Sequence, residues 1–355
     1  MAASVFDIHP LVEAIARNLS PEELCCCLRV SYAWRTNFSP YLWRRIRLYS
    51  EQHYGKFNTP LTLGALARRT NQVQIVETNI PRLLDLLSDT YPLYNLSTLR
   101  VGALGCSSSS LVQLLGQSTN LQTLELLGYF GPGPVVEQFL STLRSHPRLR
   151  ELSVTTGSYT YTPKAMIWRL LLSCGNLETI FAKTHFDTKE FPPTSEALMA
   201  EVRELTGSET PSFKVKDLTI GPSLYSGDDL FASFLRFCPN VVRLNGIDYS
   251  PEFVPEFLVL QLGRLKKLEG LVLRRVTQMG LGVEAKLQAL HEELYEMGRQ
   301  QVTHLFETLS TLPEMRRVEL QGMREAMVIL EIDKAKQCWN YIEALSYYDE
   351  NIRYY

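Results

Sequence analysis

Apolar and polar residues alternate in one short pattern that recurs along most of the chain. The segment NLQTLEL at residues 120–126 is a clear copy, with apolar residues at its second, fifth and seventh positions. Alternation of this length is typical of a half-buried β-strand. Seven further segments share the pattern and lie at residues 95–101, 148–154, 176–182, 214–220, 240–246, 267–273 and 314–320, after a weaker copy at 72–78.

The spacing of these copies and the residues between them define a repeating unit. The first apolar residues of the eight segments are separated by 25, 28, 28, 38, 26, 27 and 47 positions. Five of these seven intervals fall within the period of leucine-rich repeats, which the L-x-x-L-x-L segments resemble. Connecting segments such as SSSLVQLLGQ, residues 108–117, carry apolar residues at helical spacing. The fold class expected is therefore α/β, a strand–helix solenoid in which each repeat buries its apolar positions against its neighbours.

Three short helices are predicted before the repeats. The first covers residues 11–19. The second begins with Ser20-Pro21-Glu22-Glu23, in which Ser20 is the N-cap and Glu23 closes a capping box, and it runs to about Tyr32. The third is predicted to open at Ser39-Pro40, because a capping serine followed by proline is a common helix start.

The N-terminal helices also carry a distinctive order of residues. It reads Ile8, Pro10, Glu13, Ile15, Leu19, Leu24, Leu28, Val30 and Trp34, followed by the Leu42-Trp43 pair. This order resembles an F-box over residues 6–48, although the usual Leu-Pro-x-Glu opening appears here as Ile8-His9-Pro10-Leu11-Val12-Glu13. The resemblance implies adaptor-binding roles for Ile8, Pro10, Leu11, Ile15, Leu24, Leu28, Val30, Trp34, Leu42 and Trp43.

An F-box followed by leucine-rich repeats is similar to the substrate receptors of SCF-type ubiquitin ligases. The resemblance implies a Skp-type adaptor and cullin complex as partners, an unidentified target protein on the repeats, no catalysis and no cofactor. The alternative is a leucine-rich-repeat scaffold or inhibitor whose N-terminal helices only cap the array. The expected domains are an F-box-like domain at 1–48, a helical linker at 49–70, the leucine-rich-repeat domain at 71–340 and a C-terminal tail at 341–355.

The composition excludes several other classes. Among 355 residues, 36 Lys and Arg nearly balance 38 Asp and Glu, so no overall electric field favours nucleic acid or membrane. No segment approaches the roughly 20 apolar residues that a membrane span needs. The seven cysteines form an odd and mostly scattered set, which suits free thiols in a reducing compartment, the cytoplasm or the nucleus.

The cysteines do not predict a metal site. Cys25, Cys26 and Cys27 are adjacent on the second helix, where successive side chains point about 100° apart and cannot converge on one tetrahedral ion. We expect Cys27 to be buried and Cys26 to point outward. Cys174 and Cys238 both lie three residues before a strand, so they share one position in a repeated turn.

One motif suggests an enzyme. The segment from Gly280 to Ala285 matches G-x-G-x-x-A, follows a predicted strand and opens a helix, which is the context of a dinucleotide-binding turn. The helical pattern then continues to about Leu309, which leaves no strand for the acidic residue that binds the ribose. We therefore interpret the match as a chance one.

Target recognition is expected on the concave side of the solenoid. In each L-x-x-L-x-L strand the third and fifth residues face that side. The residues predicted to contact the target are Arg100, Glu125, Glu151, Phe181, Arg243 and Arg317. The alternative is that these solvent-facing polar positions contact nothing. Two insertions, at residues 183–212 and 282–312, interrupt the repeat, and the sequence leaves open whether they bind a partner or pack on the solenoid.

Overall fold

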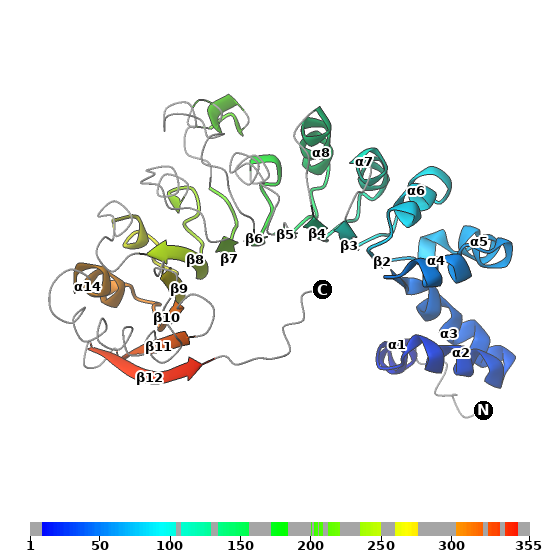
Figure 1. Cartoon of the computed structure of the whole chain (residues 1–355), viewed down its shortest axis with the longest axis horizontal. Helices are drawn as coiled ribbons and strands as arrows, with labels where there is room; N and C mark the ends of the chain where they lie inside the picture. Colours follow the sequence, from blue (N-terminus) through cyan, green and yellow to red (C-terminus); the bar gives the residue numbers. More distant parts are fainter. Residues whose placement is uncertain are drawn as a thin grey trace. The chain divides into compact units, whose positions relative to one another are not determined.

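The chain folds into an N-terminal helical unit followed by a leucine-rich-repeat solenoid, which confirms the predicted fold class. The computed structural model describes residues 9–103, 108–128, 134–155, 172–183, 200, 202–204, 206–208, 212–220, 235–249, 260–275, 303–321, 326–333 and 338–346. The chain divides into two compact units, residues 1–151 and 152–355. In each unit the order of the strands in the sheet follows their order in the sequence (Figure 1).

Three helices form the start of the first unit. They are α1 His9–Arg17, α2 Pro21–Val30 and α3 Tyr32–Arg44. Their core consists of Val12, Ala16, Leu24 and Phe38, which are at most 5% exposed. The predicted capping box is confirmed, because the Glu23 amide donates to Ser20 Oγ at 3.2 Å and the Ser20 amide donates to Glu23 Oε2 at 2.7 Å.

The predicted start of the third helix is wrong. The helix begins eight residues before Pro40, at Tyr32, with Ser31 as its N-cap and Pro40 inside it. A proline in a helix interior costs about 3 kcal/mol because it removes one hydrogen bond and its ring crowds the preceding turn. The helix continues through it because Trp34, Phe38 and Leu42 recur every four residues and pack on the three-helix core. Tertiary packing therefore outweighs the local stop signal.

Four parallel strands and the helices between them make up the rest of the first unit. The strands are β1 Arg45–Leu48, β2 Ile75–Thr78, β3 Thr98–Ala103 and β4 Thr123–Gly128. The connecting helices are α4 Glu51–Phe57, α5 Pro60–Ala67, the short η2 Thr70–Gln72, α6 Pro81–Thr90, α7 Ser108–Gln117 and α8 Pro134–Arg144. Helices α6, α7 and α8 lie on the same side of the strands (Figure 1). β1 lies inside the predicted F-box-like domain, yet it is also the first strand of the sheet.

The second unit continues the same pattern and ends differently. Its parallel strands are β6 Thr179–Lys183, β7 Asp217–Ile220, β8 Arg243–Tyr249, β9 Gly270–Arg275 and β10 Arg317–Gln321, with β5 Glu151–Thr155 at the boundary between the units and α14 Thr303–Thr311 before β10. Two antiparallel strands follow, β11 Ala326–Asp333 and β12 Cys338–Ser346. The C-terminal tail predicted from residue 341 therefore begins inside a strand.

The repeat forms because one apolar position per strand is always buried. The residues that occupy this position in successive repeats are each at most 1% exposed, and they are Leu96, Leu121, Leu149, Leu177, Val215, Val241, Leu268 and Met315. Burying a side chain of this size contributes about 1.5–3 kcal/mol. Each repeat buries this side chain only when its neighbours cover it, which makes the array cooperative.

The turn before each strand is also repeated. Ser118, His146, Cys174 and Cys238 are buried, and the backbone carbonyl of each accepts a hydrogen bond from the amide three residues later. This confirms that Cys174 and Cys238 share one turn position. Burial raises the pKa of the Cys238 thiol, so this cysteine stays protonated and unreactive.

Candidate protein-binding surfaces

Apolar side chains are exposed on the helices of the first unit. Leu11 and Ile15, one turn apart on α1, are 40% and 36% exposed, and Val30 at the end of α2 is 62% exposed. Pro10 is exposed beside them in the sequence. Four of the residues predicted to bind the adaptor are therefore available on the surface.

Four other predicted adaptor residues lie in the core of the helical unit or pack against it. Leu24 is 5% exposed and belongs to the core, while Leu28, Trp34 and Leu42 are half-buried and pack against it. The Trp34 ring lies 5.4 Å from the ring of Phe38. Trp43 is half-buried, and Ile8 lies outside the described residues.

Sequence reasoning missed three of the four core residues, which are Val12, Ala16 and Phe38. Two signals could have identified them. Val12 and Ala16 are one turn apart on α1, and Phe38 follows Trp34 by one turn.

The helices connect to the sheet without a linker. Helix α3 ends at Arg44 and β1 begins at Arg45. The Gln74 amide donates to the Arg44 carbonyl at 2.9 Å, and the Arg44 guanidinium contacts Glu13 of α1 at 3.3 Å. The hydrogen bond from Arg17 lowers the pKa of Glu13, so this carboxylate stays charged beside Arg44. Backbone and side-chain bonds therefore fasten the helical unit to the first strands.

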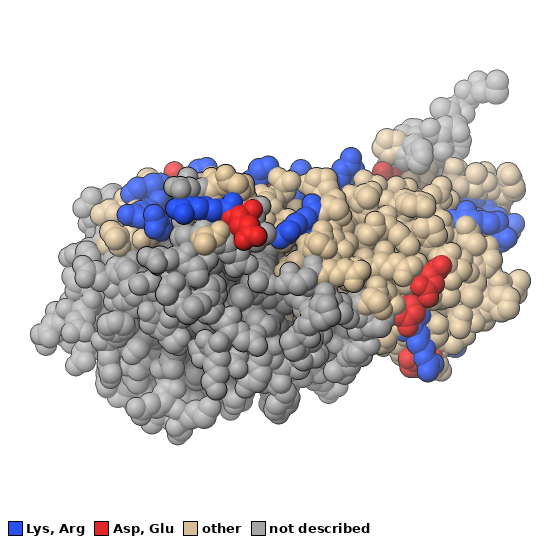
Figure 2. Space-filling model, turned by 90° about the horizontal axis from the view of Figure 1, so that it is seen from above, with Lys and Arg blue, Asp and Glu red and all other residues tan. Residues whose placement is uncertain are grey.

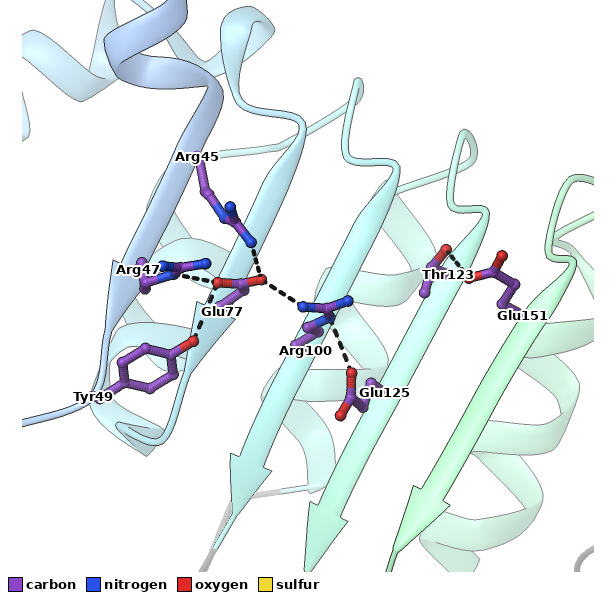
Figure 3. Close-up of polar contacts among 8 residues, drawn as sticks. All are labelled: Arg45, Arg47, Tyr49, Glu77, Arg100, Thr123, Glu125 and Glu151. Carbon is purple, nitrogen blue, oxygen red and sulfur yellow. Dashed lines mark hydrogen bonds and ion pairs between the residues drawn. The ribbon is translucent and has the colours of Figure 1, made fainter. Parts of the chain in front are cut away.

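A charged cluster lies on the face of the sheet that carries Arg45, Arg47, Tyr49, Glu77, Arg100 and Glu125, here called the inner face. Figure 3 shows these side chains on the same side of β1 to β4. The Glu77 carboxylate accepts hydrogen bonds from Arg45 at 2.6 Å, from Arg47 at 2.5 Å and from Arg100 at 3.0 Å. The Tyr49 hydroxyl donates to the same carboxylate at 3.1 Å.

Glu77 is the buried centre of this cluster. Its side chain is 1% exposed, whereas those of Arg45, Arg47 and Arg100 are 44–50% exposed. Burial alone would raise the pKa of Glu77, but the hydrogen bonds and positive charges of Arg45 and Arg47 outweigh it and lower the pKa to about 2. The carboxylate is therefore ionised at any physiological pH. The groups of the cluster that are exposed to solvent are the three guanidinium groups around it.

The cluster extends across the following strands. Arg100 Nε lies 3.0 Å from Glu125 Oε2, and Thr123 donates to Glu151 at 3.0 Å. Sequence analysis placed Arg100, Glu125 and Glu151 on this face but missed Arg45, Arg47 and Glu77. The signal was present in the register, because Arg47, Glu77, Arg100 and Glu125 form one cross-strand row.

A second row, with an apolar side chain at each end, runs next to the charged one. Tyr49 and Leu127 are 50% and 42% exposed. Between them lie Asn79 and Gly102, and a Cβ added to Gly102 would sit 1.9 Å from Asn79 Oδ1. Gly102 therefore lets the Asn79 side chain lie over β3, where this exposed amide fills the space between Tyr49 and Leu127.

The remaining predicted target contacts lie on β6, β8 and β10 of the second unit. Phe181 is half-buried. Arg243 is exposed and lies 3.9 Å from Asp217, and Arg317 lies 2.8 Å from Glu319 on its own strand. Figure 2 shows Lys and Arg side chains gathered along one edge of the face in view. In the turns that precede the strands of this unit, Lys216 donates to Glu178 at 2.7 Å and Lys267 donates to Asn240 at 2.7 Å.

Two other features suggested chemistry, the three adjacent cysteines and the segment from Gly280 to Ala285. Cys25 and Cys26 are exposed and Cys27 is half-buried. Within the described ranges, no group of three or more His, Cys, Asp or Glu side chains could hold a metal ion. The segment from Gly280 to Ala285 and most of both insertions lie outside the described residues. In the part of the chain that the structure describes, no helix has the length and apolar character to cross a membrane.

Comparison with known proteins identifies the N-terminal unit. Residues 9–49 match the family model described as F-box-like. No curated protein sequence matches the chain. Among solved structures, the crystal structure of the leucine-rich repeat-containing protein LegL7 from Legionella pneumophila shares 14% sequence identity, with a TM-score of 0.41, over 86% of this chain and 88% of that one. The chain thus carries an F-box-like domain ahead of its repeats.

Proposed function

We propose that this chain is the substrate-recognition subunit of an SCF-type ubiquitin ligase. In this proposal the F-box-like helices dock on a Skp-type adaptor and thereby on a cullin complex, and the repeats bind a target protein. The chain itself performs no catalysis and needs no cofactor. The proposed localisation is the cytoplasm, the nucleus or both.

The F-box-like match over residues 9–49 is the observation that carries the proposal. It coincides with the three helices, and Leu11, Ile15 and Val30 leave apolar surface exposed on them. Exposed apolar side chains that lie close together commonly mark protein interfaces. Binding of the adaptor would bury this surface.

The direct join between helices and sheet supports a mechanism. A receptor raises the effective concentration of its target near the ubiquitin-conjugating enzyme, and that gain depends on the geometry of the connection. Because β1 follows Arg44 without a linker, and because Gln74 bonds to the Arg44 carbonyl, the first repeats would move together with the adaptor-bound helices.

The competing proposal is a leucine-rich-repeat scaffold or inhibitor without a ubiquitin role. In that case the helices would serve only to cap the first strand, since the end of a repeat array needs cover. The exposure of Leu11 and Ile15 favours the receptor, because a cap needs its outer face to be polar.

Capture of the full-length chain by an immobilised Skp-type adaptor tests the proposal. We expect wild-type protein to bind and the variant Ile15→Asp to lose binding by at least about tenfold, the effect of burying an unpaired charge. Leu61→Asp is the matched control, because Leu61 is 87% exposed on α5, outside the F-box-like segment. If wild type is not captured, or if Ile15→Asp binds as well as Leu61→Asp, the receptor proposal is wrong.

A further inference from the structure

We infer that the inner face of β1 to β4 binds an extended acidic peptide, in which an Asp or Glu side chain is followed two residues later by a bulky apolar one. This deepens the proposed function, because it assigns a chemical class to the target segment that the repeats recognise. The candidate contacts are Arg47 and Arg100 for the carboxylate, and Tyr49 and Leu127 for the apolar side chain.

Buried Glu77 prepares the guanidinium groups for this role. A carboxylate held by three arginines fixes their side chains before a ligand arrives, which reduces the conformational entropy lost on binding. Arg47 donates one hydrogen bond to Glu77 out of the five N–H groups that an arginine carries, and its side chain is 50% exposed. Arg100 bridges Glu77 and Glu125 and is 47% exposed. Both retain outward donors for a further acceptor.

The charge of the cluster selects the kind of acid. Arg45, Arg47 and Arg100 carry three positive charges, and Glu77 and Glu125 carry two negative ones, so the five side chains sum to +1. One incoming carboxylate neutralises this sum. A phosphate carrying close to two negative charges would instead leave an excess negative charge beside two fixed carboxylates. The cluster therefore suits Asp or Glu better than a phosphorylated residue.

The geometry of the face sets the spacing in the peptide. Arg47 of β1 and Tyr49, which directly follows the end of β1, lie two residues apart, and Glu125 and Leu127 of β4 repeat this separation. Two residues along a strand span about 7 Å, which is also the distance between same-side residues of an extended peptide. Between Tyr49 and Leu127 the exposed Asn79 side chain covers Gly102, and we expect its amide to contact the peptide backbone.

Panning a phage-displayed library of random twelve-residue peptides against the full-length chain tests this inference. We expect enrichment of peptides with Asp or Glu two residues before Leu, Phe or a similar side chain. The affinity of a synthetic copy should fall about tenfold or more for Arg47→Gln and for Arg100→Gln, the effect of losing one charge-assisted hydrogen bond. Replacing the acidic residue of the peptide by Gln or Asn should have a similar effect.

Arg148→Gln is the control, because Arg148 is an exposed arginine of the same unit that bonds to Asn120 in a turn. No enrichment, enrichment of peptides lacking acidic residues, equal loss for Arg148→Gln, or tighter binding of a phosphoserine version would each overturn the inference. Adaptor capture is measured on the same proteins. Its failure would contradict the proposed function alone, whereas wild-type capture by Arg47→Gln together with lost peptide binding supports both.

Discussion

Replacing the buried carboxylate of Glu77 is the sharpest test of how the first unit is held together. In Glu77→Gln the three arginines lose the negative charge between them. The pKa of Glu77 falls from 4.5 to about 2 in the folded state. A shift of one pKa unit corresponds to about 1.4 kcal/mol. The ionised cluster therefore contributes about 3 kcal/mol to the free energy of unfolding.

This value agrees in size with the cost of removing one partner from a buried ion pair, about 3–5 kcal/mol. We therefore expect Glu77→Gln to lower the free energy of unfolding of the first unit by about 3 kcal/mol at pH 7. The measurement is urea unfolding followed by circular dichroism, with hydrogen exchange of the β1, β2 and β3 amides to locate the loss.

The dependence on pH gives a second, independent check. Because the folded-state pKa of Glu77 is depressed, the stabilisation is fully present above about pH 4.5 and is lost as the pH falls toward 2. The difference in free energy of unfolding between wild type and Glu77→Gln should therefore become smaller as the pH falls from 4.5 toward 2.

Glu125→Gln is the matched control, because the Glu125 side chain is 31% exposed and pairs with Arg100 alone among the described residues. A half-exposed pair contributes about 1 kcal/mol or less. The reasoning fails if Glu77→Gln is no more destabilising than Glu125→Gln. It also fails if the difference in free energy of unfolding between wild type and Glu77→Gln is unchanged at low pH.

Four further predictions concern separate parts of the chain. Trp34→Ala should lower the free energy of unfolding of the helical unit by about 3 kcal/mol and abolish adaptor capture, while the second unit stays resistant to protease. If adaptor capture and the protease resistance of the second unit are both lost, the scaffold proposal is favoured. Gly102→Ala should lower the free energy of unfolding of the first unit by about 1 kcal/mol or less in urea unfolding, because the new methyl group displaces only the end of the exposed Asn79 side chain, and Asn79→Ala should remove this effect. Metal analysis should find no stoichiometric zinc lost when the cysteines at 25–27 are changed to serine, and dinucleotide titration should show no saturable micromolar binding that depends on Gly280.

The sequence alone determined the features that depend on neighbours along the chain. The capping box between Ser20 and Glu23 needs only a spacing of three residues, so it could be predicted and is present. The buried position of each strand follows from alternation within seven residues, and the shared turn of Cys174 and Cys238 follows from the period of the repeat. The exposed side of β3 and β4, with Arg100 and Glu125, follows from the same alternation.

Only the tertiary structure decided how distant residues meet. Pro40 predicts a helix start locally, but packing of Phe38 in the core carries the helix through it. Glu77 lies in a weak copy of the repeat and has the appearance of an ordinary solvent-facing residue. Arg45 and Arg47, about thirty positions earlier, bury it, because parallel pairing of β1 with β2 brings them to its side. Register between strands depends on the whole sheet, so no local pattern reveals which carboxylate will be enclosed.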